Sequence, residues 1–78
     1  MKWAHKFRSP ITLKDGRKIA SLVQARDLMG EIPDVRLKNA HWHYAGDRLW
    51  QAAKLGDDES IEDARQRMLR ALEAEGLI

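Results

Sequence analysis

The fold of this chain is decided by residues 11–21, Ile-Thr-Leu-Lys-Asp-Gly-Arg-Lys-Ile-Ala-Ser. An Asp-Gly pair between two segments of alternating hydrophobicity is a strong signal for a β-hairpin. A two-residue loop would scatter the apolar side chains over both faces of the hairpin. A three-residue loop over residues 14–16, with Gly16 left-handed, sets Ile11 opposite Ile19 and keeps the apolar side chains on one face. We therefore predict a hairpin with a bulged turn.

The alternation extends upstream almost to the first residue and predicts a half-buried strand. Even-numbered positions are mostly polar or basic. The opposite face consists of Trp3, His5, Phe7, Ile11 and Leu13. A period of two is typical of a strand with one apolar and one polar face. Because Pro10 has no N–H to donate to a neighbouring strand, we expect the strand to lie at an edge or to be broken there.

The segment after the hairpin predicts a first helix and then a connection. Ser21 has the hydroxyl of a good N-cap, and Gln24 stands three residues later, at the spacing of a capping box. The helix ends at Gly30 and Pro33, since neither residue favours its continuation. A connection then leads to Asn39, which is suited to cap a second helix.

Two longer helices follow the connection. The second covers about residues 40–55 and stops at Gly56. Residues 57–60, Asp-Asp-Glu-Ser, supply acids and an N-cap to the start of the third, which runs to Glu75 with Gly76 as its C-cap. Apolar residues recur at helical spacing in both segments. The inward-facing positions are Trp42, Ala45, Leu49, Ala52 and Ala53 in the second helix, and Ile61, Ala64, Met68, Ala71 and Leu72 in the third.

These elements predict an α+β fold, an N-terminal β-hairpin packed on three α-helices (ββααα), in a single domain over residues 1–78. A two-stranded hairpin is not stable alone, so the helices must cover its apolar face. We place residues 40–55 in the middle, because that helix is apolar on more than one side. A core of this size leaves only about 3–5 kcal/mol of stability, so the chain is either marginally stable or helped by a partner subunit.

Composition excludes several classes of protein. The chain has no Cys, which excludes disulfides, a Cys-based zinc site and a thiol nucleophile. No apolar run approaches the length of about 18 residues that a membrane span needs. We therefore expect a cytoplasmic protein without membrane contact. The five Gly are isolated at predicted turns and helix ends, so there is no phosphate-binding loop and we expect no cofactor.

The histidines and serines predict no catalytic or metal site. His41 and His43 would point about 200° apart on a helix and cannot share a metal ion. His43 and Asp47, four positions apart, are either a base with its orienting acid or a surface histidine near an aspartate. Ser21 and Ser60 are better explained as helix caps than as nucleophiles. We predict that the protein is not an enzyme and holds no metal ion.

Three Trp residues are unusual in a chain of 78 residues. Trp3 and Trp42 lie on predicted apolar faces, and we expect them in the core. Trp50, Tyr44 and Leu55 lie outside the main apolar stripe of the second helix. An exposed Trp that a partner covers removes a large area from water at a modest entropy cost. Trp50 is therefore either the anchor of a protein interface that includes Tyr44 and Leu55, or a partly buried residue beside the first or third helix.

Charge is distributed unevenly along the chain. Residues 1–20 contain six Lys or Arg and one acid, whereas residues 39–78 contain five basic and eight acidic residues. If the apolar strand face packs inward, the solvent face of the hairpin includes Lys6, Arg8, Lys14 and Lys18. A basic two-stranded ribbon can contact the phosphates of nucleic acid. The alternative is that these charges deter edge-to-edge aggregation of the strands.

The order of several short motifs resembles a known family. Ile-Thr-Leu, Gly and Ile-Ala-Ser in residues 11–21 are followed by Ala-Arg-Asp-Leu at 25–28, Ile-Pro at 32–33, Leu-Trp-Gln-Ala-Ala-Lys-Leu-Gly at 49–56 and Gly-Leu at 76–77. Together, over about residues 7–77, they resemble the small alphaproteobacterial, often rhizobial, proteins known as the domain of unknown function 982 family. The resemblance implies a small α+β fold and a bacterial cytoplasmic setting. It implies no activity and no functional residue, because none is established for that family.

The sequence thus favours a small protein of unknown function that acts as a non-catalytic protein-interaction or regulatory module. Its partner would be another protein or a second copy of the chain in a homodimer, with Trp50, Tyr44 and Leu55 at the interface. The alternative is a nucleic-acid-binding protein that uses the basic face of the hairpin.

Overall fold

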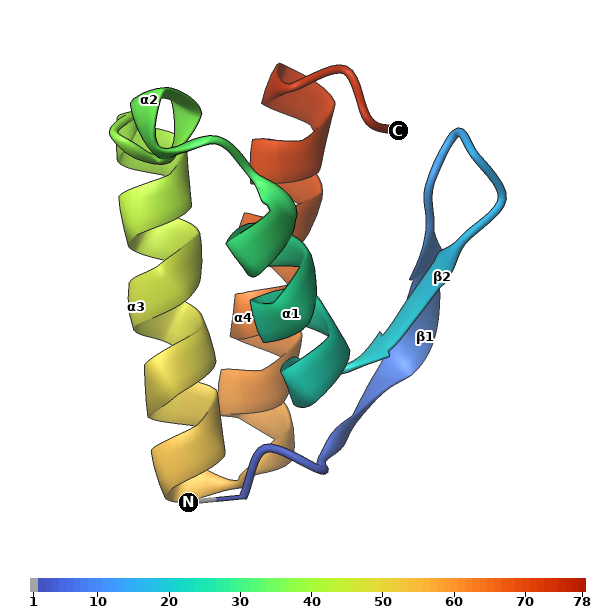
Figure 1. Cartoon of the computed structure of the whole chain (residues 1–78). Helices are drawn as coiled ribbons and strands as arrows, with labels where there is room; N and C mark the ends of the chain where they lie inside the picture. Colours follow the sequence, from blue (N-terminus) through green and yellow to red (C-terminus); the bar gives the residue numbers. More distant parts are fainter. Residues whose placement is uncertain (1) are drawn as a thin grey trace.

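The chain forms a hairpin that stands against a layer of helices (Figure 1). The computed structural model describes residues 2–78, with the backbone alone at Asp34. In chain order the elements are β1 (Lys6–Thr12), β2 (Lys18–Ser21), α1 (Leu22–Glu31), α2 (Asp34–Leu37), α3 (Ala40–Leu55) and α4 (Asp58–Ala74). The antiparallel pair of strands followed by helices confirms the predicted α+β arrangement, to which α2 adds a single turn.

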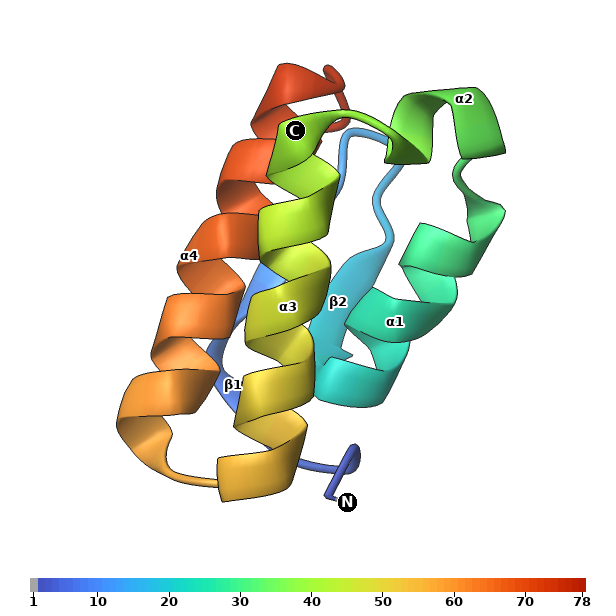
Figure 2. The same cartoon turned by 90° about the vertical axis from the view of Figure 1, so that its left-hand side faces the viewer.

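Helix α3 lies between α1 and α4, in the middle of the helix layer as predicted (Figure 2). The hairpin lies on the other side of this layer, where β1 packs against α4 and β2 packs against α1. The prediction laid the hairpin across three helices, whereas its main contacts are with these two. One long face of α3 therefore points away from the rest of the described chain.

The turn of the hairpin has the predicted register. Ile11 pairs with Ile19, and the N–H of Leu13 donates to the carbonyl of Arg17 at 2.8 Å. Gly16 has a φ of 92°, a left-handed conformation that favours glycine. The three-residue loop is confirmed, because it is the loop that keeps the apolar side chains of both strands on the helix side.

The start of the first strand differs from the prediction. β1 begins at Lys6, so Trp3 and His5 precede the ladder. Lys6 pairs with Ser21, and Ile11 pairs with Ile19, so five residues along β1 correspond to only two along β2. The register therefore shifts between these two pairs. Pro10 lies within the shifted segment and has no N–H for the ladder, which agrees with the predicted break in pairing.

Ser21 caps α1, as predicted. Its hydroxyl oxygen accepts a hydrogen bond from the N–H of Gln24 at 3.4 Å. In a capping box the Gln24 side chain would accept from the N–H of the cap residue itself. Here Gln24 Oε1 accepts from the N–H of Ala20 at 2.6 Å, one residue earlier. The side chain thus links the end of β2 to the first turn of α1.

The connection predicted before Asn39 contains a helical turn, α2. Pro33, at its N-cap, has a φ of −57°, and its carbonyl accepts from the N–H groups of Arg36 and Leu37 at 2.9 and 3.1 Å. Proline fixes φ near this value and needs no partner for an N–H, which suits a helix start. The prediction used Pro33 only as the end of α1 and missed this second role.

The ends of α3 and α4 differ from the predictions in detail. Asn39 precedes α3 but makes no side-chain cap. At the start of α4, Asp57 is the cap, because its carboxylate accepts from the N–H of Ser60 at 3.3 Å; the cap role predicted for Ser60 was wrong. Gly56 after α3 and Gly76 after α4 have φ values of 71° and 74°, so both glycines end their helices as predicted.

The core lies between the hairpin and the helices and contains the residues predicted from periodicity. The buried residues of α3 and α4 match the two predicted stripes residue for residue. The hairpin contributes Phe7, Ile11, Leu13 and Ile19. Five of the buried residues of α3 and α4 are alanines at 0% exposure, whose small side chains allow helices to pack closely: Ala45, Ala52, Ala53, Ala64 and Ala71. Within residues 2–78, no helix has the length and apolar content that crossing a membrane would require.

Candidate functional site

The face of α3 that points away from the rest of the described chain, called its outer face below, carries most of the exposed large apolar side chains. Four such side chains are more than half exposed among the described residues, and three of them are Tyr44 (57%), Trp50 (55%) and Leu55 (64%). The fourth is Val35 (74%) in α2. The exposure of the three α3 residues follows from the helical period, which turns them away from the stripe that faces the core.

Trp50 is held in place by the N-terminal segment. Its ring meets the ring of Trp3 edge-on, with centroids 5.3 Å apart and planes at 84°. The guanidinium of Arg26 in α1 lies 4.7 Å from the centroid of the Trp3 ring. Backbone hydrogen bonds tie this segment to two helices, from the N–H of Lys2 to the carbonyl of Ala53 and from the N–H of Val23 to the carbonyl of Trp3.

The position of Trp3 corrects its assignment to the core. Trp3 is half-buried and packs against the edge of the core, because the chain turns before β1 instead of extending as a strand. Trp42, the other Trp assigned to the core, is 1% exposed, as predicted. Trp50, for which either an interface anchor or partial burial beside the first or third helix was predicted, is 55% exposed, and its ring packs on Trp3 of the N-terminal segment.

Tyr44 and Leu55 lie on the other flank of the same face. Arg48 lies four positions after Tyr44 and therefore on the same side of α3. Its side chain forms an ion pair with Asp63 of α4 at 3.3 Å. The guanidinium of Arg67 in α4 lies 5.6 Å from the centroid of the Tyr44 ring. Tyr44 and Trp50 are six positions apart, which places them about 120° apart around the helix axis. The outer face therefore has two separate apolar flanks.

A polar strip separates the two flanks. It consists of His43, Asp47, Gln51 and Lys54, all exposed. No ion pair or hydrogen bond joins His43 to Asp47 in the described part of the chain, so the proposed base and its orienting acid are not brought together. Asp47 and Lys54 likewise make no ion pair with another described residue.

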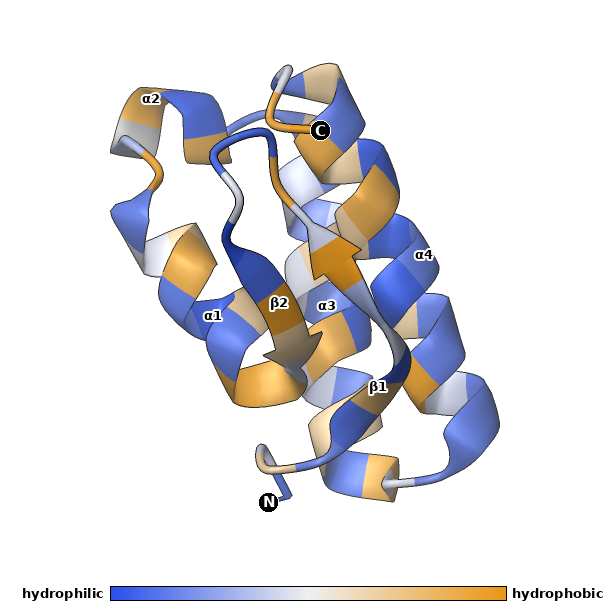
Figure 3. Cartoon of the chain, turned by 90° about the vertical axis from the view of Figure 1, so that its right-hand side faces the viewer, coloured by the Kyte–Doolittle hydropathy of each residue, from blue (hydrophilic) through white to orange (hydrophobic). Residues whose placement is uncertain are grey.

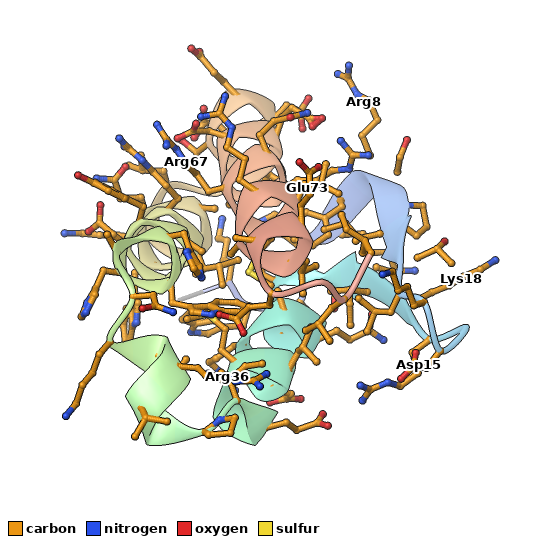
Figure 4. The ribbon with its side chains drawn as sticks, turned by 90° about the horizontal axis from the view of Figure 1, so that it is seen from above. Arg8, Asp15, Lys18, Arg36, Arg67 and Glu73 are labelled. Carbon is orange, nitrogen blue, oxygen red and sulfur yellow. The ribbon has the colours of Figure 1, made fainter. Side chains whose placement is uncertain are left out.

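The basic residues predicted on the hairpin are all exposed: Lys6, Arg8, Lys14 and Lys18. None of them makes an ion pair within residues 2–78. In Figure 4 Arg8 and Lys18 project from the hairpin side of the molecule, which faces the viewer in Figure 3. Lys6 and Arg8 also line a pocket of about 220 Å³ together with Asp58 and Glu62 of α4, so positive charge is partly offset there.

Arg17, in the hairpin turn region, is engaged with acids of its own chain. Its guanidinium contacts Asp15 at 2.7 Å and Glu31 of α1 at 3.1 Å. The hydrogen bond to Glu31, followed by that to Asp15, raises the pKa of Arg17 above its ordinary value. The backbone hydrogen bond from Arg17, followed by its side-chain bond, lowers the pKa of Asp15 despite the opposing effect of desolvation. Arg17 is thus less available to an anionic partner than the four basic residues named above.

A nearly buried carboxylate joins the end of α4 to the start of α3. The Glu75 side chain is 8% exposed. Its Oε1 accepts from Trp42 Nε1 at 3.2 Å and from Asn39 Nδ2 at 3.5 Å and contacts His41 Nε2 at 3.2 Å, while Arg36 lies 3.5 Å from Oε2. Burial alone would raise the pKa of Glu75, but the hydrogen bonds from Trp42, His41 and Asn39 and the charge of Arg36 outweigh it and lower that pKa.

The histidines and acidic residues form no metal site in the described chain. No group of three or more His, Asp or Glu side chains within residues 2–78 is placed to hold a metal ion. His41 contacts Glu75, and His43 is exposed. His5 Nε2 is buried without a hydrogen-bond partner and lies beside Gly56, where an added Cβ would come within 2.9 Å of it.

Comparison with protein-family models, with curated proteins and with solved structures finds no match to this chain.

Sequence reasoning missed the Glu75 cluster, although two signals pointed to it. A glutamate at the C-terminal end of a helix faces the negative end of the helix dipole, so its presence there calls for compensating donors. A buried Trp also requires an acceptor for its indole N–H. The two signals identify Trp42 as a donor and Glu75 as an acceptor. The packing of α3 against α4 brings these two residues together although they are far apart in the sequence.

Proposed function

We propose that this chain is a small, non-catalytic protein-interaction module that self-associates through the outer face of α3. The observation that carries the proposal is the concentration of exposed large apolar side chains on this one helix. Exposed large apolar side chains bordered by polar residues on one face are typical of protein interfaces. The proposal includes a cytoplasmic location, which the absence of Cys supports. Membership in the domain of unknown function 982 family stays a prediction.

The contacts of the two aromatic rings support this function. Trp3 contacts the Trp50 ring, and Arg67 lies over the Tyr44 ring, so contacts within the chain restrict both rings while they stay more than half exposed. A side chain that is already ordered loses little conformational entropy when a partner covers it. Trp and Tyr are also enriched among the residues that contribute most to binding energy. Trp50 is therefore the expected anchor of the interface.

We expect Trp50→Ala to weaken self-association at least tenfold, an effect of about 1.4 kcal/mol or more that is ordinary for an interface Trp. Sedimentation velocity over a concentration series up to tens of micromolar measures this directly. Val35→Ala is the matched control, because Val35 is even more exposed but lies in α2. A wild-type chain that stays monomeric throughout the series, or a Trp50→Ala variant that associates as the wild type does, would contradict the proposal.

We infer nucleic-acid binding as a second candidate function, and one observation favours it. The four basic hairpin residues are exposed and unpaired with acids of the described chain, whereas Arg17 is held by two carboxylates. Such residues can form phosphate contacts without first breaking an ion pair. Lysine contacts to phosphate would give binding that depends on salt more than on sequence.

We expect Lys6→Glu/Lys18→Glu to abolish any binding of random duplex or single-stranded DNA at low salt. Lys38→Glu/Arg70→Glu makes the same change in net charge away from the hairpin and should leave most of the binding intact. Fluorescence anisotropy at two salt concentrations measures both, since each lost phosphate contact reduces the salt dependence. If the wild type fails to bind at low salt, or if the two double variants behave alike, the hairpin is not a nucleic-acid site.

A further inference from the structure

The outer face of α3 is complementary to itself when it is turned end for end. Consider two identical helices that pack antiparallel about a two-fold axis. A residue that lies n positions before the axis in one copy faces the residue that lies n positions after the axis in the other copy. Asp47 stands three positions before Trp50, and Lys54 stands four positions after it. With a rise of about 1.5 Å per residue, an axis at Trp50 brings Asp47 within one residue of the level of Lys54 in the other copy.

The apolar flanks match under the same operation. Tyr44 stands six positions before Trp50 and Leu55 five positions after it, so they too come within one residue of the same level. A two-fold axis of this kind sets each flank against the same flank of the second copy. The flank beside α4 then pairs Tyr44 with Leu55, and the flank beside α1 brings the two Trp50 rings together.

We propose that α3 packs antiparallel against α3 of a second copy of this chain about a two-fold axis at Trp50, with two reciprocal Asp47–Lys54 ion pairs fixing the register. The inference rests on the proposed self-association through α3. Asp47 and Lys54 are exposed and unpaired within residues 2–78, so pairing costs neither of them an existing ion pair. They are the specificity-determining residues of the interface.

The charges also select the antiparallel orientation over the parallel one. In a parallel pair about a two-fold axis, each residue faces its own copy, so Asp47 would face Asp47 and Lys54 would face Lys54. Like charges placed across an interface oppose association. The antiparallel pair replaces both repulsions with attractions.

The proposed interface is small. A helix of 16 residues is about 24 Å long, so the buried area lies at the small end of the range for protein–protein interfaces, and a micromolar dissociation constant is expected.

Charge reversal tests the register. In its own dimer, the Asp47→Lys variant has two contacts in which a lysine faces Lys54, and the Lys54→Asp variant has two contacts in which an aspartate faces Asp47. We expect each variant alone to associate about tenfold more weakly than the wild type at low salt, because two contacts change sign. An equimolar mixture of the two variants should regain association. In the mixed dimer the introduced lysine faces the introduced aspartate, and the remaining Asp47 faces the remaining Lys54, so both contacts pair opposite charges.

Sedimentation velocity of each variant and of their mixture measures the effect, and circular dichroism confirms that each variant is folded. Asp27→Lys and Lys38→Asp are matched controls, because they reverse exposed charges outside α3 and should associate as the wild type does. Raising the salt concentration should reduce the difference between the variants and the wild type.

The outcomes separate the register from the function. If Trp50→Ala weakens association but the mixture regains nothing, α3 is the interface and the antiparallel register at Trp50 is wrong. If the chain associates and neither Trp50→Ala nor the charge reversals alter it, both the register and the use of α3 are wrong. Recovery in the mixture, with each variant weakened when alone, supports both.

Discussion

Trp42→Ala is expected to leave the chain largely unfolded in water at 25 °C. Trp42 is 1% exposed and belongs to the core that α3 and α4 share. Truncating a buried Trp to Ala costs about 3–5 kcal/mol, through lost burial and the cavity that remains. A core of this size supplies a total stability of about the same magnitude. The single substitution therefore removes most of the free energy of unfolding.

Urea denaturation followed by far-UV circular dichroism measures this loss. Trp50→Ala is the control, since it makes the same chemical change at a side chain that is 55% exposed, and at low protein concentration it should cost far less. Trp42→Phe keeps most of the apolar area but removes the indole N–H that donates a hydrogen bond to Glu75. The stability of this variant should therefore lie between those of Trp42→Ala and Trp50→Ala. A folded Trp42→Ala variant with most of the wild-type stability would show that the core does not depend on this ring.

The second large effect is expected at Glu75 and depends on pH. Four donors around the carboxylate lower its pKa below the ordinary value of 4.5, although burial acts in the opposite direction. A group whose pKa is lower in the folded state binds its proton more weakly there than in the unfolded chain. Its contribution to stability is therefore present above the unfolded pKa and is lost as pH falls through the folded pKa.

Glu75→Gln should therefore be less stable than the wild type at neutral pH, and the difference should shrink on acidification. The amide resembles the protonated acid in carrying no charge. If its oxygen keeps the hydrogen bonds from Trp42 and Asn39, its NH₂ group faces the guanidinium of Arg36, which is itself a donor. Urea denaturation at several pH values from neutral to acid measures the difference. Glu73→Gln is the matched control, because Glu73 is exposed near the same helix end and should give no comparable pH-dependent difference. A constant difference across the acid range would mean that the Glu75 charge is not what the cluster stabilises.

Much of the fold could be predicted from the sequence because local rules and burial agree. Asp-Gly specified the turn of the hairpin, and the apolar spacing in α3 and α4 specified which side faces the core. The same spacing placed Tyr44, Trp50 and Leu55 outside the buried stripe, although for Trp50 it left partial burial open. These features depend on residues a few positions apart, where geometry is set by the strand and helix repeats.

The features that could not be predicted depend on how distant segments meet. The partners of Glu75 lie 33 to 39 positions away in the sequence, so local signals could show that Glu75 needs donors and Trp42 an acceptor, but not that the two residues meet. Trp3 continued the alternation of a strand, but the chain turns there to contact α1 and α3. The split of the α3 outer face into two flanks also required knowing that α1 and α4 lie on opposite sides of it.

The packing of β1 against α4 has a consequence for the order of events during synthesis. The hairpin leaves the ribosome before the helices, yet α4, the helix that packs against β1, is the last of the four to be made. Phe7 and Ile11 therefore stay uncovered in the nascent chain until α4 has emerged. Transiently exposed apolar surface and unpaired strand edges favour aggregation, so we expect the basic residues of β1 and β2 to reduce aggregation during this interval.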